Sequence, residues 1–329
     1  MSEQLKIHKA LADETRLRLM RLLSRGPLNV NEIIGILDMG QSRISRHLKI
    51  LAEADLVTNR REGTWIYYQW NDGNGESKLL ADTFATLAAH EGDLPRYEAD
   101  LQGLEATVES RREQTRSFFD SIPDPHEYLQ HQSLDGQFYR QVATSLLPER
   151  SEVALDMGSG SGLLIPSLLE RAEKIIAVDS SNTMLDLARR TVNGDAARCD
   201  FRLGDLEHLP VADGEVDTVV ACMVLHHLSD PAAALAEAHR ALKPGGHIVI
   251  VDLHRHNDES LRDRHADLWL GFKPTDIERW LEKVDLQLTD SGIVSPELDA
   301  NAAHSRADPG DRQDPERLKL ITFKGQKPC

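Results

Sequence analysis

Cysteine is scarce in this sequence, and long apolar runs are missing. Its 329 residues include three widely separated cysteines, Cys199, Cys222 and Cys329. Their spacing argues against a disulfide framework and against a local thiolate metal site. No stretch of roughly 18 apolar residues occurs, so no membrane-spanning helix is expected. The opening MSEQLKIHKA lacks the apolar stretch of a signal peptide, so we expect a cytoplasmic protein.

Basic charge is also in short supply, but the deficit lies in one part of the chain. The formal net charge is −16. Residues 1–75 hold 11 Lys and Arg against 9 Asp and Glu, whereas residues 76–329 hold 27 against 45. Because phosphate binding depends on a local basic surface, an acidic second part does not exclude DNA binding by the first. The length fits two domains with a connecting helix.

The start of the chain is predicted to fold into short amphipathic helices. Apolar residues recur at helical spacing over 5–23, and Asp13 is placed to cap a second helix there. A third helix is expected over 29–38, ended at Gly40, and a fourth over 41–54. Two helices joined by a tight Gly-containing turn are typical of a helix-turn-helix.

A β-hairpin is expected to follow these helices. Its predicted strands, 56–59 and 64–70, flank a tip at residues 60–63. The second strand, TWIYYQW, is rich in aromatic and β-branched residues, as strands are. Arg60 and Arg61, at the predicted tip, would reach phosphates or a minor groove. The whole order predicts a winged helix-turn-helix.

The helix over 41–54 is the predicted recognition helix. Arginine can pair bidentately with guanine, and glutamine with adenine. The candidate DNA-binding residues at the start of this helix are Gln41, Ser42, Arg43, Ser45, Arg46 and His47. The alternative, a basic face that is merely solvated, is disfavoured by the order of the surrounding elements.

This stretch resembles the ArsR/SmtB family of winged-helix repressors. LADETRLRLMRLL, QSRISRHLKILAEADLV and REGTWIYY provide the resemblance. It implies a homodimer on palindromic double-stranded operator DNA, with dimer helices around 2–12 and 76–92. Metal sensors of the family often have Cys-x-Cys on the helix before the turn, where residues 30–32 here read VNE. His90 stands alone on the second expected dimer helix, so we expect neither metal ligands nor metal sensing.

The second part of the chain has the sequence pattern of an α/β fold. Residues 76–150 are expected to be mostly helical, and strands and helices alternate from Val153 onward, which predicts a mainly parallel sheet. The polar residues 291–316 are expected to form a loop, and 318–323 the last strand. The predicted parts are a winged helix-turn-helix over 1–75, a helical dimerisation or linker segment over 76–114, and a Rossmann-like domain over 115–329.

The sharpest motif is DMGSGSG at residues 156–162, directly after the strand 153–155. Its glycines allow a tight turn and let a ligand approach the backbone. A dinucleotide site would need a glycine at position 163, which is Leu163, so NAD fits poorly. The pattern instead resembles motif I of class I S-adenosylmethionine-dependent methyltransferases, whose sheet has seven strands. In that family the loop holds the amino-acid end of the cofactor.

Later features follow in the order of that family, and the resemblance is closest to small-molecule methyltransferases of ubiquinone biosynthesis. Asp179 ends the next strand, 17 residues past Gly162, where a carboxylate accepts both ribose hydroxyls. Asp205 follows the third strand, where the family's acidic residue meets the adenine. Met184 would pack on the adenine, although core packing explains it equally well. The resemblance implies that S-adenosylmethionine or S-adenosylhomocysteine is bound by Asp156, Gly158, Ser159, Gly160, Gly162, Asp179, Ser180, Met184, Asp205, Leu206 and Cys222.

The methyl acceptor is not specified by the sequence. His226 and His227 follow the fourth strand, and His226 is the candidate general base. The alternative, a histidine that orients the cofactor or packs, stays open. Arsenite methylation needs several cooperating thiols, which Cys222 alone does not supply. A nucleic-acid methyltransferase would have an Asn/Asp-Pro-Pro-aromatic motif where residues 222–225 read CMVL.

Two functions are therefore left. One is a transcriptional regulator that senses S-adenosylmethionine or S-adenosylhomocysteine and controls methyl-cycle and methionine genes. The other is an active small-molecule methyltransferase with the DNA-binding module as its regulatory device. Both need the same cofactor residues. The acceptor pocket, expected from residues 115–140 and 254–275, distinguishes them.

Overall fold

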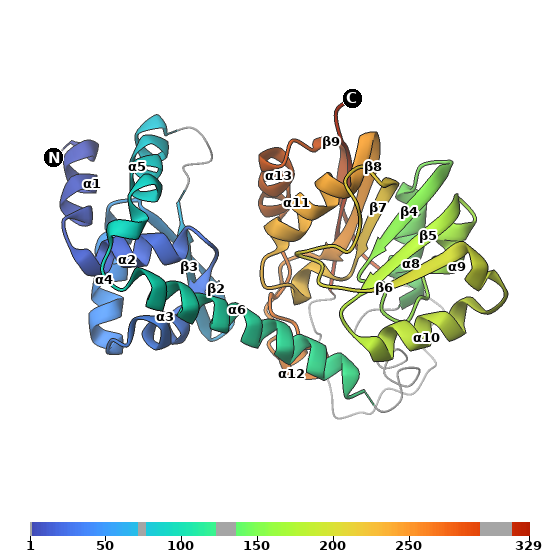
Figure 1. Cartoon of the computed structure of the whole chain (residues 1–329), viewed down its shortest axis with the longest axis horizontal. Coiled ribbons are helices and arrows are strands. Elements are labelled where there is room, and N and C mark those ends of the chain that lie inside the picture. The colour runs from blue at the N-terminus through green and yellow to red at the C-terminus, as the bar shows by residue number, and fades with distance from the viewer. Residues whose placement is uncertain (1, 72–76, 123–135, 297–317) are drawn as a thin grey trace. The chain divides into compact units, whose positions relative to one another are not determined.

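The computed structural model describes the whole chain except residues 1, 72–76, 123–135 and 297–317. It divides into two compact units, Met1–Glu113 and Gln114–Cys329 (Figure 1). Among the described helices, none is both long and apolar enough to cross a membrane.

The first unit combines helices with a small antiparallel sheet whose strand order is β1-β3-β2. Its elements are α1 (Glu3–Leu11), α2 (Glu14–Leu23), β1 (Leu28–Asn29), α3 (Val30–Leu37), α4 (Gln41–Glu53), β2 (Val57–Glu62), β3 (Trp65–Trp70), α5 (Lys78–Ala89) and the 3-10 turn η2 (Glu91–Asp93). Helix α6 (Tyr97–Asp120) begins in this unit and ends in the second.

Side chains at the helix ends explain why the helices begin where they do. Asp13 caps α2 by accepting a hydrogen bond from the Arg16 backbone N–H, as the sequence predicted. Asn29 and Glu32 form a capping box at the start of α3. On α4, Ile44 and Leu48 are fully buried in the core of this unit. The helix-turn-helix expectation is confirmed.

The wing differs from the sequence prediction at its tip. Strand β2 continues through Glu62, which pairs with Trp65, so the turn consists of Gly63 and Thr64 alone. Gly63 has φ +60°, the conformation that two-residue hairpin turns require. Arg60 and Arg61 therefore lie on the strand, and not at the tip. The Glu62 side chain at the end of β2 is buried and ion-paired with Arg60 on the same strand.

The second unit is built on a seven-stranded sheet with the order β6-β5-β4-β7-β8-β10-β9. The first five strands in this order are parallel, and β10 is antiparallel to both β8 and β9. The mainly parallel α/β sheet is confirmed. Its strands are β4 (Ser151–Met157), β5 (Ala172–Asp179), β6 (Cys199–Leu203), β7 (Val216–Cys222), β8 (Leu242–Leu253), β9 (Gln287–Val294) and β10 (Leu320–Gln326).

Helices and 3-10 turns connect these strands. They are α8 (Gly136–Leu146), α9 (Ile165–Leu169), α10 (Asn182–Val192), η3 (Asn193–Arg198), η4 (Leu225–His227), α11 (Pro231–Ala241), α12 (Ser260–His265) and α13 (Pro274–Lys283). The predicted loop over 291–316 is wrong at its start, because β9 pairs with β10 as far as Val294. Its remainder from residue 297 lies outside the described residues. The last strand is β10, which runs past the predicted end at residue 323.

Candidate cofactor site and DNA-binding surface

The reversal of strand order predicts a ligand site beyond the carboxyl ends of the central strands of the large sheet. The chain passes from β4 to β5 and β6 on one side, then returns to β7 on the other side of β4. In open α/β sheets, ligands bind beyond the carboxyl ends of the strands at such a reversal. The Gly-rich segment follows β4, Asp179 ends β5, and η4 follows β7. The order of the strands therefore brings three of the predicted segments together at the carboxyl ends of β4, β5 and β7.

The Gly-rich segment tolerates no side chain at two of its glycines. Gly158 has φ +80°, and a Cβ there would lie 2.3 Å from Val224 Cγ2. Gly162 has φ +74°, and a Cβ there would lie 2.8 Å from Ala188 Cα on α10. Gly160, between them, faces a space with no described atom within 4 Å of such a Cβ. The loop therefore packs tightly at its ends and leaves room for a ligand at its middle.

Asp179 is held against this loop by backbone amides. Its Oδ2 accepts a hydrogen bond of 2.8 Å from the Gly160 N–H, and its Oδ1 accepts one of 2.9 Å from the Ser181 N–H. Burial raises the pKa of Asp179, whereas these amides lower it. Ser180 is half-buried beside it. A carboxylate fixed in this way can accept hydrogen bonds from ligand hydroxyls at the sheet edge.

Asp156 lies beneath the loop, with 2% of its surface exposed. Burial, and then the charge of Asp179, raise the pKa of Asp156 to about 7. Its Oδ2 and the buried Ser159 Oγ have no hydrogen-bond partner among the described residues. Two buried polar atoms without partners under an open loop fit a polar ligand there.

The other predicted cofactor residues lie around the same edge. Asp205 is half-buried and accepts a hydrogen bond from the Glu207 N–H, whereas Leu206 and Met184 are buried. Burial raises the pKa of the Cys222 thiol well above its usual range, so it is neutral. Cys222 on β7 and Cys199 on β6 are separated in the sheet by β4 and β5, which supports the expectation against cooperating thiols.

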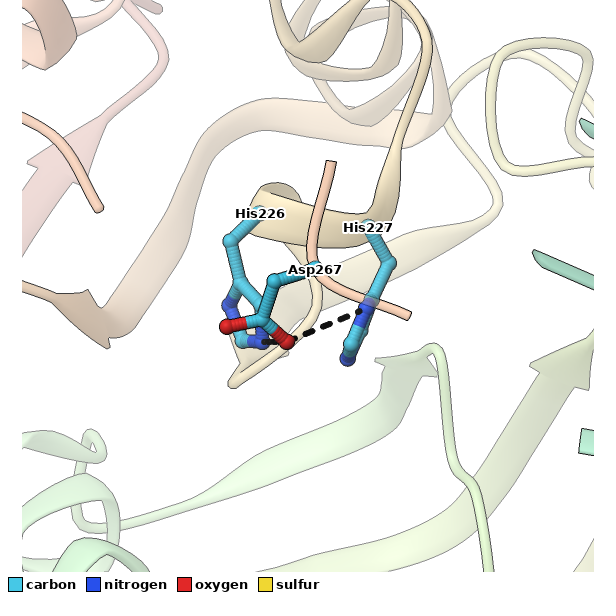
Figure 2. Close-up of side chains that lie close together, drawn as sticks. All are labelled: His226, His227 and Asp267. Carbon is cyan, nitrogen blue, oxygen red and sulfur yellow. Dashed lines mark ion pairs between the residues drawn. The ribbon is translucent and has the colours of Figure 1, made fainter. Parts of the chain in front are cut away.

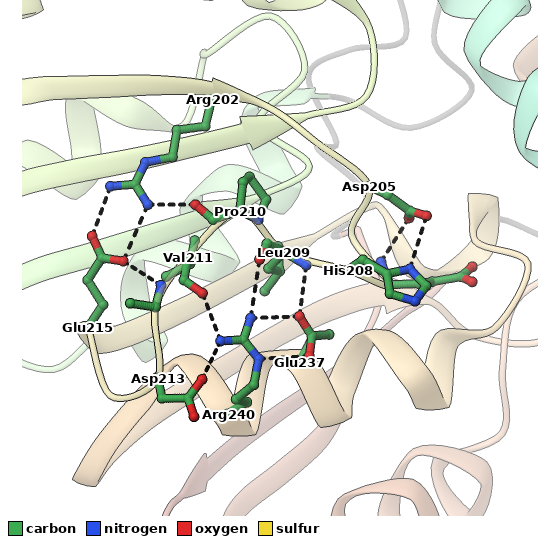
Figure 3. Close-up of polar contacts among 12 residues, drawn as sticks. Arg202, Asp205, His208, Leu209, Pro210, Val211, Asp213, Glu215, Glu237 and Arg240 are labelled. Carbon is green, nitrogen blue, oxygen red and sulfur yellow. Dashed lines mark hydrogen bonds and ion pairs between the residues drawn. The ribbon is translucent and has the colours of Figure 1, made fainter.

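An arginine that the sequence analysis missed holds the segment after Asp205 in place (Figure 3). Arg240 on α11 donates to the Val211 carbonyl at 2.8 Å and is ion-paired with Glu237 at 2.7 Å. Glu237 in turn accepts a hydrogen bond of 2.8 Å from the Leu209 N–H. The loop that contains the predicted adenine contact is thereby fixed to α11.

His226 lies between two buried carboxylates. Its Nδ1 is 2.6 Å from Asp252 Oδ1, and its Nε2 is 3.7 Å from Asp267 Oδ1 (Figure 2). Burial lowers the pKa of His226, but Asp252 and Asp267 outweigh it and bring that pKa to about 9. These two carboxylates fix the orientation of the ring, and the role of His226 as a general base stays a prediction.

His227 differs from its neighbour. Burial, and then His226, lower its pKa well below the usual range. Its ring contacts the edge of Phe119, 5.1 Å between centroids, and its carbonyl accepts a hydrogen bond from Thr115. Of the two histidines, it is the neutral one. The expected acceptor segment 115–140 thus reaches this pair through its described part, while residues 123–135 lie outside the described residues.

The predicted DNA-binding residues mostly lie on the free face of α4. Gln41, Ser42, Arg43, Ser45 and Arg46 are exposed, although Arg43 also donates to Thr15 at 3.4 Å. His47 is half-buried, 3.6 Å from Asp13, and burial lowers its pKa. On the wing, Arg61 is exposed and Arg60 is half-buried.

Helix α6 makes one buried and one partly buried set of ion pairs that the sequence did not predict. Asp100 accepts hydrogen bonds from Arg18, at 2.7 and 2.8 Å, and from Arg21. Arg111 donates to both carboxylate oxygens of Glu32 on α3, at 2.6 and 2.8 Å. These partners are 79 to 82 residues apart in the sequence, so no local pattern pairs them.

Comparisons with known proteins agree with this division. Residues 13–59 match the family model of bacterial regulatory proteins of the arsR family, and residues 155–250 match that of a methyltransferase domain. The chain joins an arsR-family segment to a methyltransferase domain. S-adenosylmethionine or S-adenosylhomocysteine is the cofactor expected for such a domain.

Individual relatives match only parts of the protein. It is 37% identical over 141 residues to an uncharacterised 37.1 kDa protein in a Streptomyces fradiae transposon, covering 41% of each. It is 30% identical over 148 residues to ubiquinone biosynthesis O-methyltransferase of Hahella chejuensis, covering 41% of this chain and 62% of that enzyme. The chain thus spans less than two thirds of the length of these relatives. The structure of the N-methyltransferase NodS from Bradyrhizobium japonicum with S-adenosylhomocysteine is 16% identical, with a TM-score of 0.48, and covers 66% of this chain and 98% of NodS.

Proposed function

We propose that the protein is a homodimeric regulator whose methyltransferase domain binds S-adenosylmethionine or S-adenosylhomocysteine and thereby adjusts its affinity for palindromic operator DNA. Methyl-cycle genes are the expected targets. The observation that carries the proposal is helix α6, which begins in the first unit and ends in the second. It is bonded near both of its ends to residues beside the proposed binding regions.

The residues of α6 that belong to the first unit are bonded to the other helices of that unit. Asp100 is ion-paired with both Arg18 and Arg21 of α2, and Arg111 pairs with Glu32 of α3. Both α2 and α3 contact the proposed recognition helix α4. A displacement of α6 would therefore act on the helices that support the DNA-reading face.

The last residue of α6 is bonded beside the proposed cofactor site. Asp120 accepts a hydrogen bond of 2.6 Å from the Ser181 hydroxyl, and the Ser181 N–H donates to Asp179. Ser181 thus connects Asp179 to the end of α6, and a ligand that binds Asp179 could act on the helix through this single residue. A coupling of only about 1–3 kcal/mol between two sites changes affinity roughly 5- to 150-fold.

The cofactor residues follow from the geometry of the site. Asp179 would accept ribose hydroxyls, and the open backbone at Gly160 would face the amino-acid part. Bound S-adenosylmethionine would supply an electrophilic methyl group at this edge. Holding an acceptor in line with that group would be the main task of the surrounding residues.

A DNA-binding titration tests the regulator. Fluorescence anisotropy with promoter DNA, repeated with each cofactor form, should show that one form changes the affinity at least five-fold. S-adenosylhomocysteine is the expected signal, because it reports the state of the methyl cycle. Zinc and arsenite serve as the comparison. A response to a metal ion alone, or a full-affinity monomer by light scattering, would contradict the proposal.

Methyl transfer to a small molecule is the second candidate function. The methyltransferase-domain match and the similarity to a ubiquinone biosynthesis O-methyltransferase support it. Incubation with S-adenosylmethionine and a panel of phenols and amines, followed by mass spectrometry, tests it. An enzyme forms S-adenosylhomocysteine only when an acceptor is present, whereas a sensor binds both forms without turnover.

A further inference from the structure

Asp267 presents a buried carboxylate oxygen to two histidines. Its side chain is 2% exposed, and its Oδ1 accepts no hydrogen bond from any residue that the structure describes. This oxygen lies 3.7 Å from His226 Nε2 and 3.9 Å from His227 Nδ1 (Figure 2). A direct hydrogen bond would bring these nitrogens about 0.8 and 1.0 Å closer, respectively. Neither nitrogen is therefore within hydrogen-bond distance of this oxygen.

The orientation of His226 is fixed by its other nitrogen. Asp252 accepts from His226 Nδ1 at 2.6 Å and also receives the Leu225 and Leu253 backbone N–H groups. Because Nδ1 is bonded to Asp252, Nε2 is the nitrogen that faces Asp267, and a bound cation would replace the proton on Nε2. Histidines that bind metals usually donate their other ring N–H to a carboxylate in this way, which fixes the orientation of the ring.

We propose that His226, His227 and Asp267 form a binding site for one divalent first-row transition cation of the zinc type. Their candidate ligand atoms all lie within 4.8 Å of one another. Ligand atoms around tetrahedral zinc, at about 2.0–2.1 Å from the metal, lie roughly 3.3 Å apart. The separations of 3.7 and 3.9 Å from Asp267 Oδ1 need a closure of roughly half an ångström, and the two histidine nitrogens, within 4.8 Å of each other, would also move together.

The ligand types select the class of cation. Two imidazole nitrogens and one carboxylate favour zinc, iron(II) or cobalt(II) over magnesium or calcium, which prefer oxygen ligands. Three protein ligands leave at least one coordination position for water or for an oxygen of a small molecule. The contact of 3.3 Å between His227 Nδ1 and the Ala266 carbonyl would be given up on binding.

The site departs from the expectation of no metal ligands, because the sequence shows no spacing that signals it. His226 and His227 are adjacent on η4, but Asp267 lies 40 residues further on, just after α12. The His226 carbonyl accepts hydrogen bonds from the Leu268 and Trp269 N–H groups, which brings Asp267 to the histidine pair. Neither DNA binding nor the cofactor is needed for this inference.

Metal binding to the purified full chain tests it. After treatment with EDTA and dialysis, calorimetric titration with zinc should give one tight site per chain, and cobalt(II) should produce visible d–d absorption. Asp267→Asn and His227→Gln should each weaken zinc binding roughly ten-fold or more and lose the cobalt spectrum. The matched control is His247→Gln, on β8 opposite Thr218 near the start of β7, which should change neither.

Melting temperatures separate binding from folding. Zinc should raise the melting temperature of the parent chain, and much less that of His227→Gln, whose ring is partly exposed and whose replacement should fold. The proposal would be overturned by the absence of a stoichiometric zinc site. It would equally be overturned if both cluster variants bound zinc as tightly as the parent chain did.

Discussion

The carboxylate of Asp120 and the hydroxyl of Ser181 are joined by a hydrogen bond of 2.6 Å. Asp120 is the last residue of α6, and Ser181 lies two residues after Asp179. The same carboxylate is 3.4 Å from the Thr183 N–H at the start of α10. One acidic side chain therefore connects the helix end to the segment behind the proposed ribose contact.

Replacing this acidic side chain should uncouple the two proposed functions. In Asp120→Asn, the charge-assisted bond to Ser181 is weakened while Asp179 remains. We expect cofactor affinity within about three-fold of the parent value, but loss of most of the ligand's effect on DNA affinity. Calorimetry measures the cofactor affinity, and fluorescence anisotropy measures the effect of the ligand on DNA affinity. Glu109→Gln, on the same helix and exposed, is the control. An unchanged ligand response in Asp120→Asn would rule out this route.

Loss of the Asp179 carboxylate should abolish most cofactor binding. Hydrogen bonds to a charged group contribute about 1.5–3 kcal/mol each, so Asp179→Ala should weaken binding by at least ten-fold. Isothermal titration with S-adenosylhomocysteine gives the affinity, and circular dichroism gives the fold. Asp186→Ala on α10, exposed and paired with Arg189, is the matched control. Near-normal affinity in Asp179→Ala would show that the pocket is wrongly placed.

The exposed arginines of α4 should contribute to DNA binding. Arg43→Ala and Arg46→Ala should each weaken operator binding by about 1–3 kcal/mol if they contact bases. Lys49→Ala, two turns from the start of α4 and 3.8 Å from Glu53, should have a smaller effect. Anisotropy on operator and on random DNA separates the contacts, since an equal loss on both would show that the arginines touch phosphates only.

The ionisation of Asp156 should make stability depend on pH. Its folded-state pKa is raised from 3.8 to about 7, so the folded chain keeps a proton that the unfolded chain releases between these values. Stability therefore falls as pH rises through this window, by up to roughly 4 kcal/mol, and stays low above it.

Asp156→Asn removes this ionisation. The melting temperature of the variant, relative to that of the parent chain, should therefore increase from pH 5 to pH 8 in the absence of cofactor. Differential scanning calorimetry at both pH values measures it, with Asp186→Asn as the exposed control. A constant difference would mean that Asp156 ionises normally in the folded chain.

Local patterns in the sequence predicted the elements well, because capping and periodicity act over a few residues. Asp13 at the start of α2, the turn at Gly40 and the glycines after β4 all belong to this class. The end of β2 was misplaced, since a turn at Gly63 and Thr64 depends on the pairing of Glu62 with Trp65. The geometry of such a hairpin is a property of two strands together.

Contacts between distant residues escaped prediction. Asp252 follows an apolar stretch near the end of β8, just as Asp179 ends β5. This similarity could have marked Asp252 as a residue near the site. Nothing near Asp267 or Asp100 in the sequence indicates which side chains they meet. His226 was identified from its position after β7, whereas the two carboxylates that raise its pKa, Asp252 and Asp267, come from other parts of the chain.

The pairing of Asp100 with Arg18 and Arg21 bears on where the chain can be cut. A fragment that ends at residue 75 would keep both guanidinium groups inside the first unit and discard their counter-ion, which typically costs about 3–5 kcal/mol for a buried pair. It would also lose Arg111, the partner of Glu32. The smallest portable fragment that contains the proposed DNA-binding surface therefore extends to about residue 113, where the first compact unit ends.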